Sequence, residues 1–241
     1  MTNPSVLHPP TPVALVTGGS RGLGRALAAD LAGRGWQVVI DARDPAGLSG
    51  AAVFMPAGRV TAVPGDVAEP AHRALIAEAL WRLGRLDVLV NNASTLGPAP
   101  QPAMADYPVD ALADVYAVNV LAPLALCQLT LPLLERSGGA ILNISSDAAV
   151  ESYEGWGGYG SSKAALDHIT ATLAAENPAV RIYSVDPGEM ATDMLATAMP
   201  AADLRDWPAP ATVVPALWRL IDGDLPSGRY RAAELDPAHA R

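Results

Sequence analysis

The chain has 241 residues, of which half are hydrophobic and one is cysteine, and its formal net charge is −9 at pH 7. This length and apolar content predict a single domain with a large core, and one cysteine excludes an internal disulfide and a multi-cysteine metal site. We therefore expect a cytoplasmic protein without a bound metal, and the negative charge disfavours nucleic acid as a partner because it repels the phosphate backbone.

The N-terminal residues 1–12 contain four prolines and no basic segment followed by an apolar core. We expect them to form a flexible tail rather than a signal peptide. The longest apolar stretch, at 120–134, is interrupted by two prolines and two polar residues and is too short to span a bilayer. No membrane partner is therefore expected.

Short apolar runs alternate with helical patterns along the rest of the chain. The apolar runs predict strands at 13–17, 36–40, 59–63, 86–90, 140–144 and 181–185. Helical periodicity predicts helices at 23–31, 70–83, 109–136 and 161–175. This alternation predicts an α/β fold, a doubly wound parallel sheet flanked by helices on both faces, as a single domain over 13–241.

Two stretches do not fit this alternation. The stretch at 45–58 is ambiguous between helix and loop. The stretch at 191–215 is rich in Ala, Pro and Met without clean periodicity. We expect it to cover the substrate.

A glycine-rich segment at 17–24 follows the first predicted strand and opens the first predicted helix. Glycines there permit a tight turn and close approach of the backbone to a pyrophosphate, and the helix N-terminus offers N–H donors. The spacing is Gly-x-x-x-Gly-x-Gly rather than Gly-x-Gly-x-x-Gly, so the nucleotide prediction depends on the position between strand and helix.

The chain contains a single lysine among its sixteen basic residues, and this lysine stands four residues after a tyrosine. On a helix, Tyr159 and Lys163 would share a face. A fixed ammonium beside a phenol would lower the tyrosine pKa and make Tyr159 a proton donor or acceptor. The alternative is that one lysine survived by chance in an arginine-rich composition.

Further motifs follow in a fixed order. Asp66 and Val67 come after the third strand, and 91–94 reads Asn-Asn-Ala-Ser after the fourth. Asn119 lies in the long helix, Ser146 stands thirteen residues before Tyr159, and Pro187, Gly188 and Thr192 follow the sixth strand. With the glycine segment and the Tyr-x-x-x-Lys pattern, the chain resembles the short-chain dehydrogenase/reductase family of the shorter, single-domain type, from residue 13 to about 230. Ser94 departs from the family's usual Gly.

The resemblance implies a Rossmann-like, NAD(P)-dependent oxidoreductase that transfers a hydride between nicotinamide and a carbonyl or alcohol substrate. Tyr159 would be the general acid and base, Ser146 would hold the substrate oxygen, Lys163 would hydrogen-bond the nicotinamide ribose, and Asn119 would anchor a water. The cofactor-binding residues would be Gly18, Ser20, Arg21, Gly22, Leu23, Gly24, Arg43, Asp66, Val67, Asn92, Ala93, Tyr159, Lys163, Pro187, Gly188 and Thr192.

The end of the second strand bears on the choice of cofactor. An acidic residue there binds the adenosine ribose and repels a 2′-phosphate, whereas an arginine pairs with the phosphate. Ala42 occupies the position where NAD-preferring members of the family carry Asp, and Arg43 and Arg21 supply cations. NADP(H) is therefore favoured over NAD(H), although Asp41 would reach the ribose if the strand end shifted by one residue.

The substrate is less constrained than the cofactor. The resemblance implies that the pocket walls come from the segments at 94–96, 147–156 and 189–199, which follow the fourth, fifth and sixth strands. These segments combine acidic, aromatic and methionine side chains, which suits a bulky neutral ketone or alcohol or a cationic substrate better than an anionic thioester carrier. The alternative functions are an NADP-binding regulatory or sensor protein and an isomerase or dehydratase of the same fold.

Two expectations complete the sequence-based account. The resemblance implies that the helices at 109–136 and 161–175 pair between subunits, which would give a homodimer or homotetramer. None of the four histidines is assigned to catalysis or to a metal, since His8 and His239 lie in the terminal tails and His72 and His168 lie on predicted helices.

Overall fold

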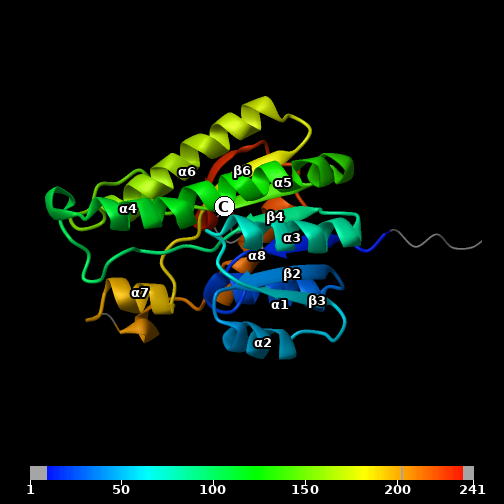
Figure 1. Ribbon diagram of the computed structural model, residues 1–241, viewed down its shortest axis with the longest axis horizontal. Coiled ribbons are helices and arrows are strands. Elements are labelled where there is room, and N and C mark those ends of the chain that lie inside the picture. The colour runs from blue at the N-terminus through cyan, green and yellow to red at the C-terminus, as the bar shows by residue number, and fades with distance from the viewer. Residues whose placement is uncertain (1–9, 202, 236–241) are drawn as a thin grey trace, which may run out of the picture.

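The strands form one parallel sheet in the order β3-β2-β1-β4-β5-β6-β7 (Figure 1). The computed structural model describes residues 10–201 and 203–235, so His8, His239 and most of the tail expected at 1–12 lie outside the described residues. The strands are β1 (Val13–Val16), β2 (Gln37–Ala42), β3 (Val60–Pro64), β4 (Val88–Asn91), β5 (Ala140–Ile144), β6 (Arg181–Asp186) and β7 (Gly228–Arg231).

Helices cover both faces of this sheet. The α-helices are α1 (Gly22–Gly33), α2 (Pro45–Val53), α3 (Pro70–Leu83), α4 (Val109–Tyr116), α5 (Ala122–Ser137), α6 (Gly157–Glu176), α7 (Asp193–Ala198), α8 (Val214–Ile221) and α9 (Ala232–Leu235). Side chains of α1 and α8 form a core on one face, and those of α3 and α5 form a core on the other. The predicted doubly wound fold is confirmed.

Strand β1 shows how the sequence builds these two cores. Successive side chains of a strand point to opposite faces of the sheet. Val13 and Leu15 accordingly belong to the core under α3 and α5, whereas Ala14 and Val16 belong to the core under α1 and α8. All four are buried, as expected for a central parallel strand with helices on both sides.

Several elements differ from the sequence-based expectation. The ambiguous stretch contains α2, which begins because the Asp44 side chain accepts hydrogen bonds from Ala46 N and Gly47 N. Helix α6 begins at Gly157, ahead of the predicted start at 161. Strand β7 was missed because it is an edge strand of sequence Gly-Arg-Tyr-Arg without an apolar run. Helices α7, α8 and α9 were also missed.

The long helix that contains α4 and α5 is continuous over Val109–Ser137, through the π-helical turn η2 (Ala117–Leu121). By length and composition its 29 residues are sufficient to cross a membrane, so the argument from a short apolar stretch is wrong. Half of its most apolar window is buried inside the protein, where α5 packs on the sheet. A buried core helix of a soluble protein meets the same criteria of length and composition, so these criteria are weak evidence for a membrane span.

Candidate active site

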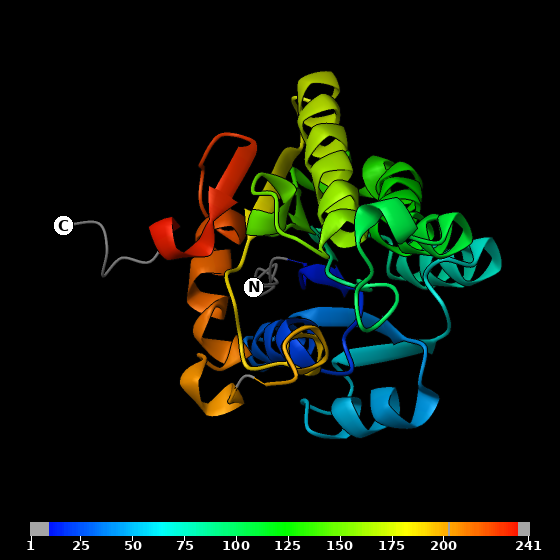
Figure 2. The same ribbon diagram turned by 90° about the vertical axis from the view of Figure 1, so that its left-hand side faces the viewer.

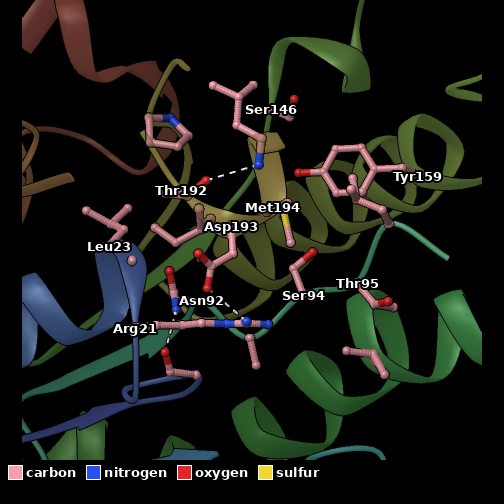
Figure 3. Close-up of a pocket in the computed structure, with 18 of the residues that line it drawn as sticks. Arg21, Leu23, Asn92, Ser94, Thr95, Ser146, Tyr159, Thr192, Asp193 and Met194 are labelled. Atoms are coloured by element: carbon pink, nitrogen blue, oxygen red, sulfur yellow. Dashed lines mark hydrogen bonds and ion pairs between the residues drawn. The ribbon is translucent and has the colours of Figure 1, made fainter. Parts of the chain in front are cut away.

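A cavity of about 780 Å³ lies at the carboxyl ends of the strands. Strand β1 pairs with β2 on one side and β4 on the other, so the chain reverses its winding there, which is where doubly wound sheets bind ligands. The glycine-segment residues Arg21 and Leu23 lie on one side of the cavity and Tyr159 lies on the other (Figure 3). Of the predicted site residues, all except Gly24 and Asn119 line this cavity.

The glycine segment takes a backbone path that its glycines permit. Gly18 and Gly22 have φ angles of +66° and +56°, in the left-handed region that disfavours other residues. Gly24 has a different role from the predicted cofactor contact. A Cβ at Gly24 would lie 2.5 Å from both Gly18 O and Asn92 Nδ2, so this glycine allows α1 to start directly behind the loop. The result is an open cradle of backbone that fits a pyrophosphate.

Thr17 and Asn92 fix this loop to the neighbouring strand. The Thr17 hydroxyl accepts hydrogen bonds from Asn92 N at 2.9 Å and Ala93 N at 3.0 Å. The Asn92 side-chain amide donates to Thr17 O at 2.8 Å. The loops after β1 and β4 are therefore held together at the floor of the cavity, and a pyrophosphate and a nicotinamide could bind on one rigid support.

Asp41 faces the glycine segment rather than the tip of β2. Asp41 is 1% exposed, its Oδ1 accepts from Gly18 N at 2.8 Å, and its Oδ2 lies 3.1 Å from His72 Nε2. Ala42 follows at the end of the strand, and Arg43 is exposed on the cavity wall. The register that would place Asp41 on a ribose is therefore not the one observed.

The second predicted cation, Arg21, forms an ion pair across the mouth of the cavity. Its Nη1 lies 3.0 Å from Asp193 Oδ2, and both side chains are about 70% exposed. Asp193 is the first residue of α7, and in Figure 2 the yellow-to-orange segment that carries α7 lies next to the blue start of α1. The stretch predicted to cover the substrate thus lies along the cavity.

The predicted catalytic side chains converge from β5 and α6. Tyr159 lies in the first turn of α6, and its ring packs edge-on against Trp156 at 5.8 Å between centroids. Lys163 Nζ lies 5.5 Å from the Tyr159 ring centroid and donates to Ile144 O at 2.7 Å. The Ser146 hydroxyl donates to Asp147 Oδ1 at 2.8 Å. Tyr159, Lys163 and Ser146 share the cavity wall.

Burial decides the protonation of the tyrosine and the lysine. It raises the pKa of Tyr159 well above its usual value, a rise that Asp147 and Asp186 support and that hydrogen bonding to Ser146 and Ser94 opposes. Burial also lowers the pKa of Lys163 to about 8, against the effect of Asp167. The prediction that Lys163 lowers the tyrosine pKa is wrong for this structure. Tyr159 is therefore a neutral phenol at pH 7.

The lysine pKa predicts a change of stability with pH. Below about pH 8 the folded chain buries Lys163 in its charged form, which destabilises it by about 3 kcal/mol. Between about pH 8 and 10.5 the folded chain has released this proton while the unfolded chain still holds it, so the destabilisation falls as the pH rises. We expect Lys163→Met to be more stable than the wild type at pH 7, and the difference to shrink by pH 9.5. Denaturant unfolding of both proteins at each pH measures it.

The comparison with the variant is needed because other groups titrate in this range. Burial raises the pKa of the Cys127 thiol to about 12, so the unfolded chain loses that proton first and stability falls above pH 9. This effect is common to the wild type and Lys163→Met and cancels in their difference. A difference that stays constant from pH 7 to 9.5 would show that Lys163 is not perturbed.

Asn119 lies in the π-helical turn and is fully buried. Its Oδ1 accepts from Ser94 Oγ at 3.1 Å and Thr95 N at 2.9 Å. Its Nδ2 donates to Thr95 O and Ser162 Oγ, both at 2.9 Å. The side-chain amide is thus fully engaged by protein groups and does not line the cavity. In this structure it ties the loop after β4 to α6, and no bond of the side chain is left for the expected water.

The substrate end of the cavity is largely apolar. Its wall includes aromatic, methionine and leucine side chains from the segment just before α6, the loop after β4 and the segment around α7, namely Leu96, Tyr153, Trp156, Met190, Met194, Leu195 and Met199. Asp147 and Glu189 add carboxyl groups. Although burial acts against it, hydrogen bonds from Ser146, Tyr153 and Ala148 N hold the pKa of Asp147 below its usual value. This end suits a bulky apolar molecule.

Sequence reasoning missed two polar side chains that shape the site. Asp147 follows Ser146 directly and engages its hydroxyl, and the sequence-based account treated it only as an acidic wall residue. His72 was set aside as a helix residue, but its spacing of four from Ile76 and eight from Leu80 places it on the buried stripe of α3. The position of His72 on this buried stripe was the signal in the sequence that its ring is buried and has a polar partner.

Comparisons with known proteins identify the family of this chain. A family model for short chain dehydrogenase matches residues 12–203. The rhamnolipids biosynthesis 3-oxoacyl-(acyl-carrier-protein) reductase of Pseudomonas aeruginosa is 38% identical over 192 residues, 76% of this chain and 74% of that one. Sepiapterin reductase of Mus musculus is 33% identical over 197 residues, 76% of each chain.

Solved structures extend the likeness to the whole fold. A Shigella flexneri protein described as a short chain dehydrogenase complexed with NADP has a TM-score of 0.83 at 27% identity and covers 92% of this chain and 97% of its own. The family model alone spans most of the sequence, including the glycine segment, Ser146, Tyr159 and Lys163. The chain therefore belongs to the short-chain dehydrogenase/reductase family and is an oxidoreductase.

Proposed function

We propose that this protein is an NADP(H)-dependent reductase of bulky, apolar ketones, with Tyr159 as the general acid. The observation that carries the proposal is that a single cavity joins the glycine segment to Tyr159, Ser146 and Lys163. A dinucleotide held along the glycine segment would therefore extend toward the residues that handle the substrate oxygen. Both characterised relatives described above are named reductases.

The charges at the adenosine end favour NADP(H) over NAD(H). Asp41 is buried against Gly18 N and His72, so its carboxylate is withdrawn from the ribose. Arg43 lies on the cavity wall. Arg21 also lines the cavity, and a bound phosphate would replace Asp193 as its exposed partner. Arginine binds phosphate through several N–H donors, whereas a carboxylate repels it. One solved relative in the family is an NADP complex.

Three residues of this chain would have separate roles in the reaction. NADPH supplies the hydride when it is bound. Tyr159 is neutral because burial raises its pKa, and it donates its phenolic proton to the substrate oxygen. Ser146 donates a hydrogen bond to the same oxygen once its hydroxyl rotates away from Asp147. Lys163 is held on Ile144 O beside the tyrosine ring, where it can bind a ribose hydroxyl.

The apolar wall defines the proposed substrate class. Flexible methionines and the rings of Tyr153 and Trp156 can pack against a large hydrophobic group. The carboxyl groups of Asp147 and Glu189 disfavour a substrate with a negative charge near its carbonyl. The proposal is therefore a neutral ketone with bulky apolar or aromatic substituents rather than an acyl carrier thioester.

Titration of the purified protein with NADPH and NADH tests this proposal. Nicotinamide fluorescence should report tighter binding of NADPH, and a panel of neutral aryl ketones, aldehydes and anionic keto acids should show oxidation of NADPH by the aryl ketones. Tighter binding of NADH would contradict the cofactor assignment. Tight NADPH binding without turnover of any carbonyl compound would instead support a cofactor-binding sensor.

A further inference from the structure

His72 is a buried histidine that the proposed reaction does not use. It lies in the first turn of α3, is 5% exposed, and its Nε2 lies 3.1 Å from Asp41 Oδ2. A carboxylate can only accept a hydrogen bond, so Nε2 carries the hydrogen. The other ring nitrogen, Nδ1, has no hydrogen-bond partner among the described residues and faces Gly65, where a Cβ would overlap it. The ring is therefore fixed in one orientation.

The partner of His72 connects three cofactor-binding segments. Asp41 Oδ1 accepts from Gly18 N at 2.8 Å, and Asp41 O accepts from Gly19 N at 2.9 Å, so the residue supports the glycine segment. Ala42 O accepts from Gly65 N at 3.0 Å, next to the Asp66 segment on which His72 packs. His72 thus holds Asp41, which supports the glycine segment, and its ring packs against Gly65 in the loop after β3.

We propose that His72 determines the cofactor preference of this chain by holding the Asp41 carboxylate on the glycine segment and away from the adenosine ribose. This inference rests on the proposed NADP(H) function. Asp41 already forms part of the cavity wall, so a carboxylate released from His72 can turn toward the ribose, accept its hydroxyl hydrogen bonds and repel a 2′-phosphate. His72 is a positioning residue, because it acts on the cofactor through Asp41.

Two amide variants separate the hydrogen bond from the packing of the ring. The Gln side chain places its amide nitrogen near the position of His Nε2, so His72→Gln keeps a donor for Asp41. The Asn side chain reaches only the position of Nδ1, so His72→Asn loses this donor. We measure the dissociation constants of NADPH and NADH for each protein by nicotinamide fluorescence.

The expected readout is the preference for NADPH, expressed as the ratio of the NADH and NADPH dissociation constants. It should fall about tenfold in His72→Asn, because a hydrogen bond to a charged group is lost, and stay within about twofold of wild type in His72→Gln. Adding Asp41→Asn to His72→Asn removes the released charge and should restore the ratio. Both constants come from the same folded sample, so a lower stability does not move their ratio.

Equal weakening of NADPH and NADH in His72→Asn would overturn the proposal and leave His72 a structural support. The same would follow if His72→Gln lost the preference as far as His72→Asn does, or if Asp41→Asn failed to restore it. The wild-type ratio is a separate result. A wild type that prefers NADH contradicts the proposed function, whereas the change of ratio among the variants still decides the role of His72.

Discussion

Replacement of Tyr159 by phenylalanine should lower the rate of ketone reduction by about a thousandfold while NADPH binding stays within about twofold of wild type. In the proposed reaction the phenol is the proton donor opposite the glycine segment, and general acid catalysis contributes 10²–10⁴-fold to rate. Burial raises the pKa of Tyr159, so the wild-type phenol holds its proton throughout the neutral range. Single-turnover oxidation of bound NADPH measures the chemical step directly.

A matched control is available at the rim of the same cavity. Tyr153 lines the cavity, is about half exposed, and donates to Asp147 Oδ2 at 2.9 Å. Tyr153→Phe removes a hydroxyl of the same kind and should change the rate by less than about tenfold, because it loses a hydrogen bond but no proton donor. Retention of more than a few per cent of the wild-type rate by Tyr159→Phe would refute the acid assignment.

Charge reversal at Arg43 should weaken NADPH by about a hundredfold and NADH by less than about threefold, because hydrogen bonds to a charged phosphate contribute roughly 1.5–3 kcal/mol. Arg43 is exposed on the cavity wall next to Ala42, where the 2′-phosphate would lie. Fluorescence titration of Arg43→Glu with the two cofactors measures both affinities.

The control for Arg43→Glu is the same change far from the site. Arg82 is in the last turn of α3, exposed, and paired with Glu78 at 2.6 Å, at the end of the helix away from the carboxyl ends of the strands. Arg82→Glu changes the net charge by the same amount as Arg43→Glu. It should leave both affinities nearly unchanged, because salt screens an exposed charge at the far end of α3 from the cofactor. Equal losses of NADPH and NADH in Arg43→Glu would show that Arg43 does not contact the 2′-phosphate.

Elements with a strong apolar pattern could be predicted from the sequence. Strand β1 is buried on both faces and is a continuous apolar run, and β5 is a buried run interrupted only by Asn143, so the positions of these strands and their parallel arrangement followed from the sequence. Strand β7 pairs only with β6, alternates between half-buried and exposed residues, and has no such run. The start of α6 was misplaced because Gly157, Gly158 and Gly160 are poor helix formers that are required by close packing against Met104, Tyr107 and Ala148.

The order of the motifs also allowed the candidate site residues to be identified, but the interactions of their side chains could not be predicted. The direction of the Asp41 side chain depends on His72 and Gly18, which lie 31 and 23 residues away. The pKa of Tyr159 depends on how deeply the tyrosine is buried, and spacing from Lys163 carries no information on that. The expected cytoplasmic location and the pairing of subunits through 109–136 and 161–175 stay predictions.

In the proposed reaction, NADPH bound in this cavity would supply hydride to the carbonyl carbon of a bulky apolar ketone while Tyr159 delivers a proton to its oxygen. The most direct measurement is the mass of the product formed with NADPH that carries deuterium at the transferred position of the nicotinamide. We predict an alcohol with one deuterium on the former carbonyl carbon, formed by the wild type and about a thousandfold more slowly by Tyr159→Phe. Absence of a deuterated alcohol from every ketone in the panel would contradict the account.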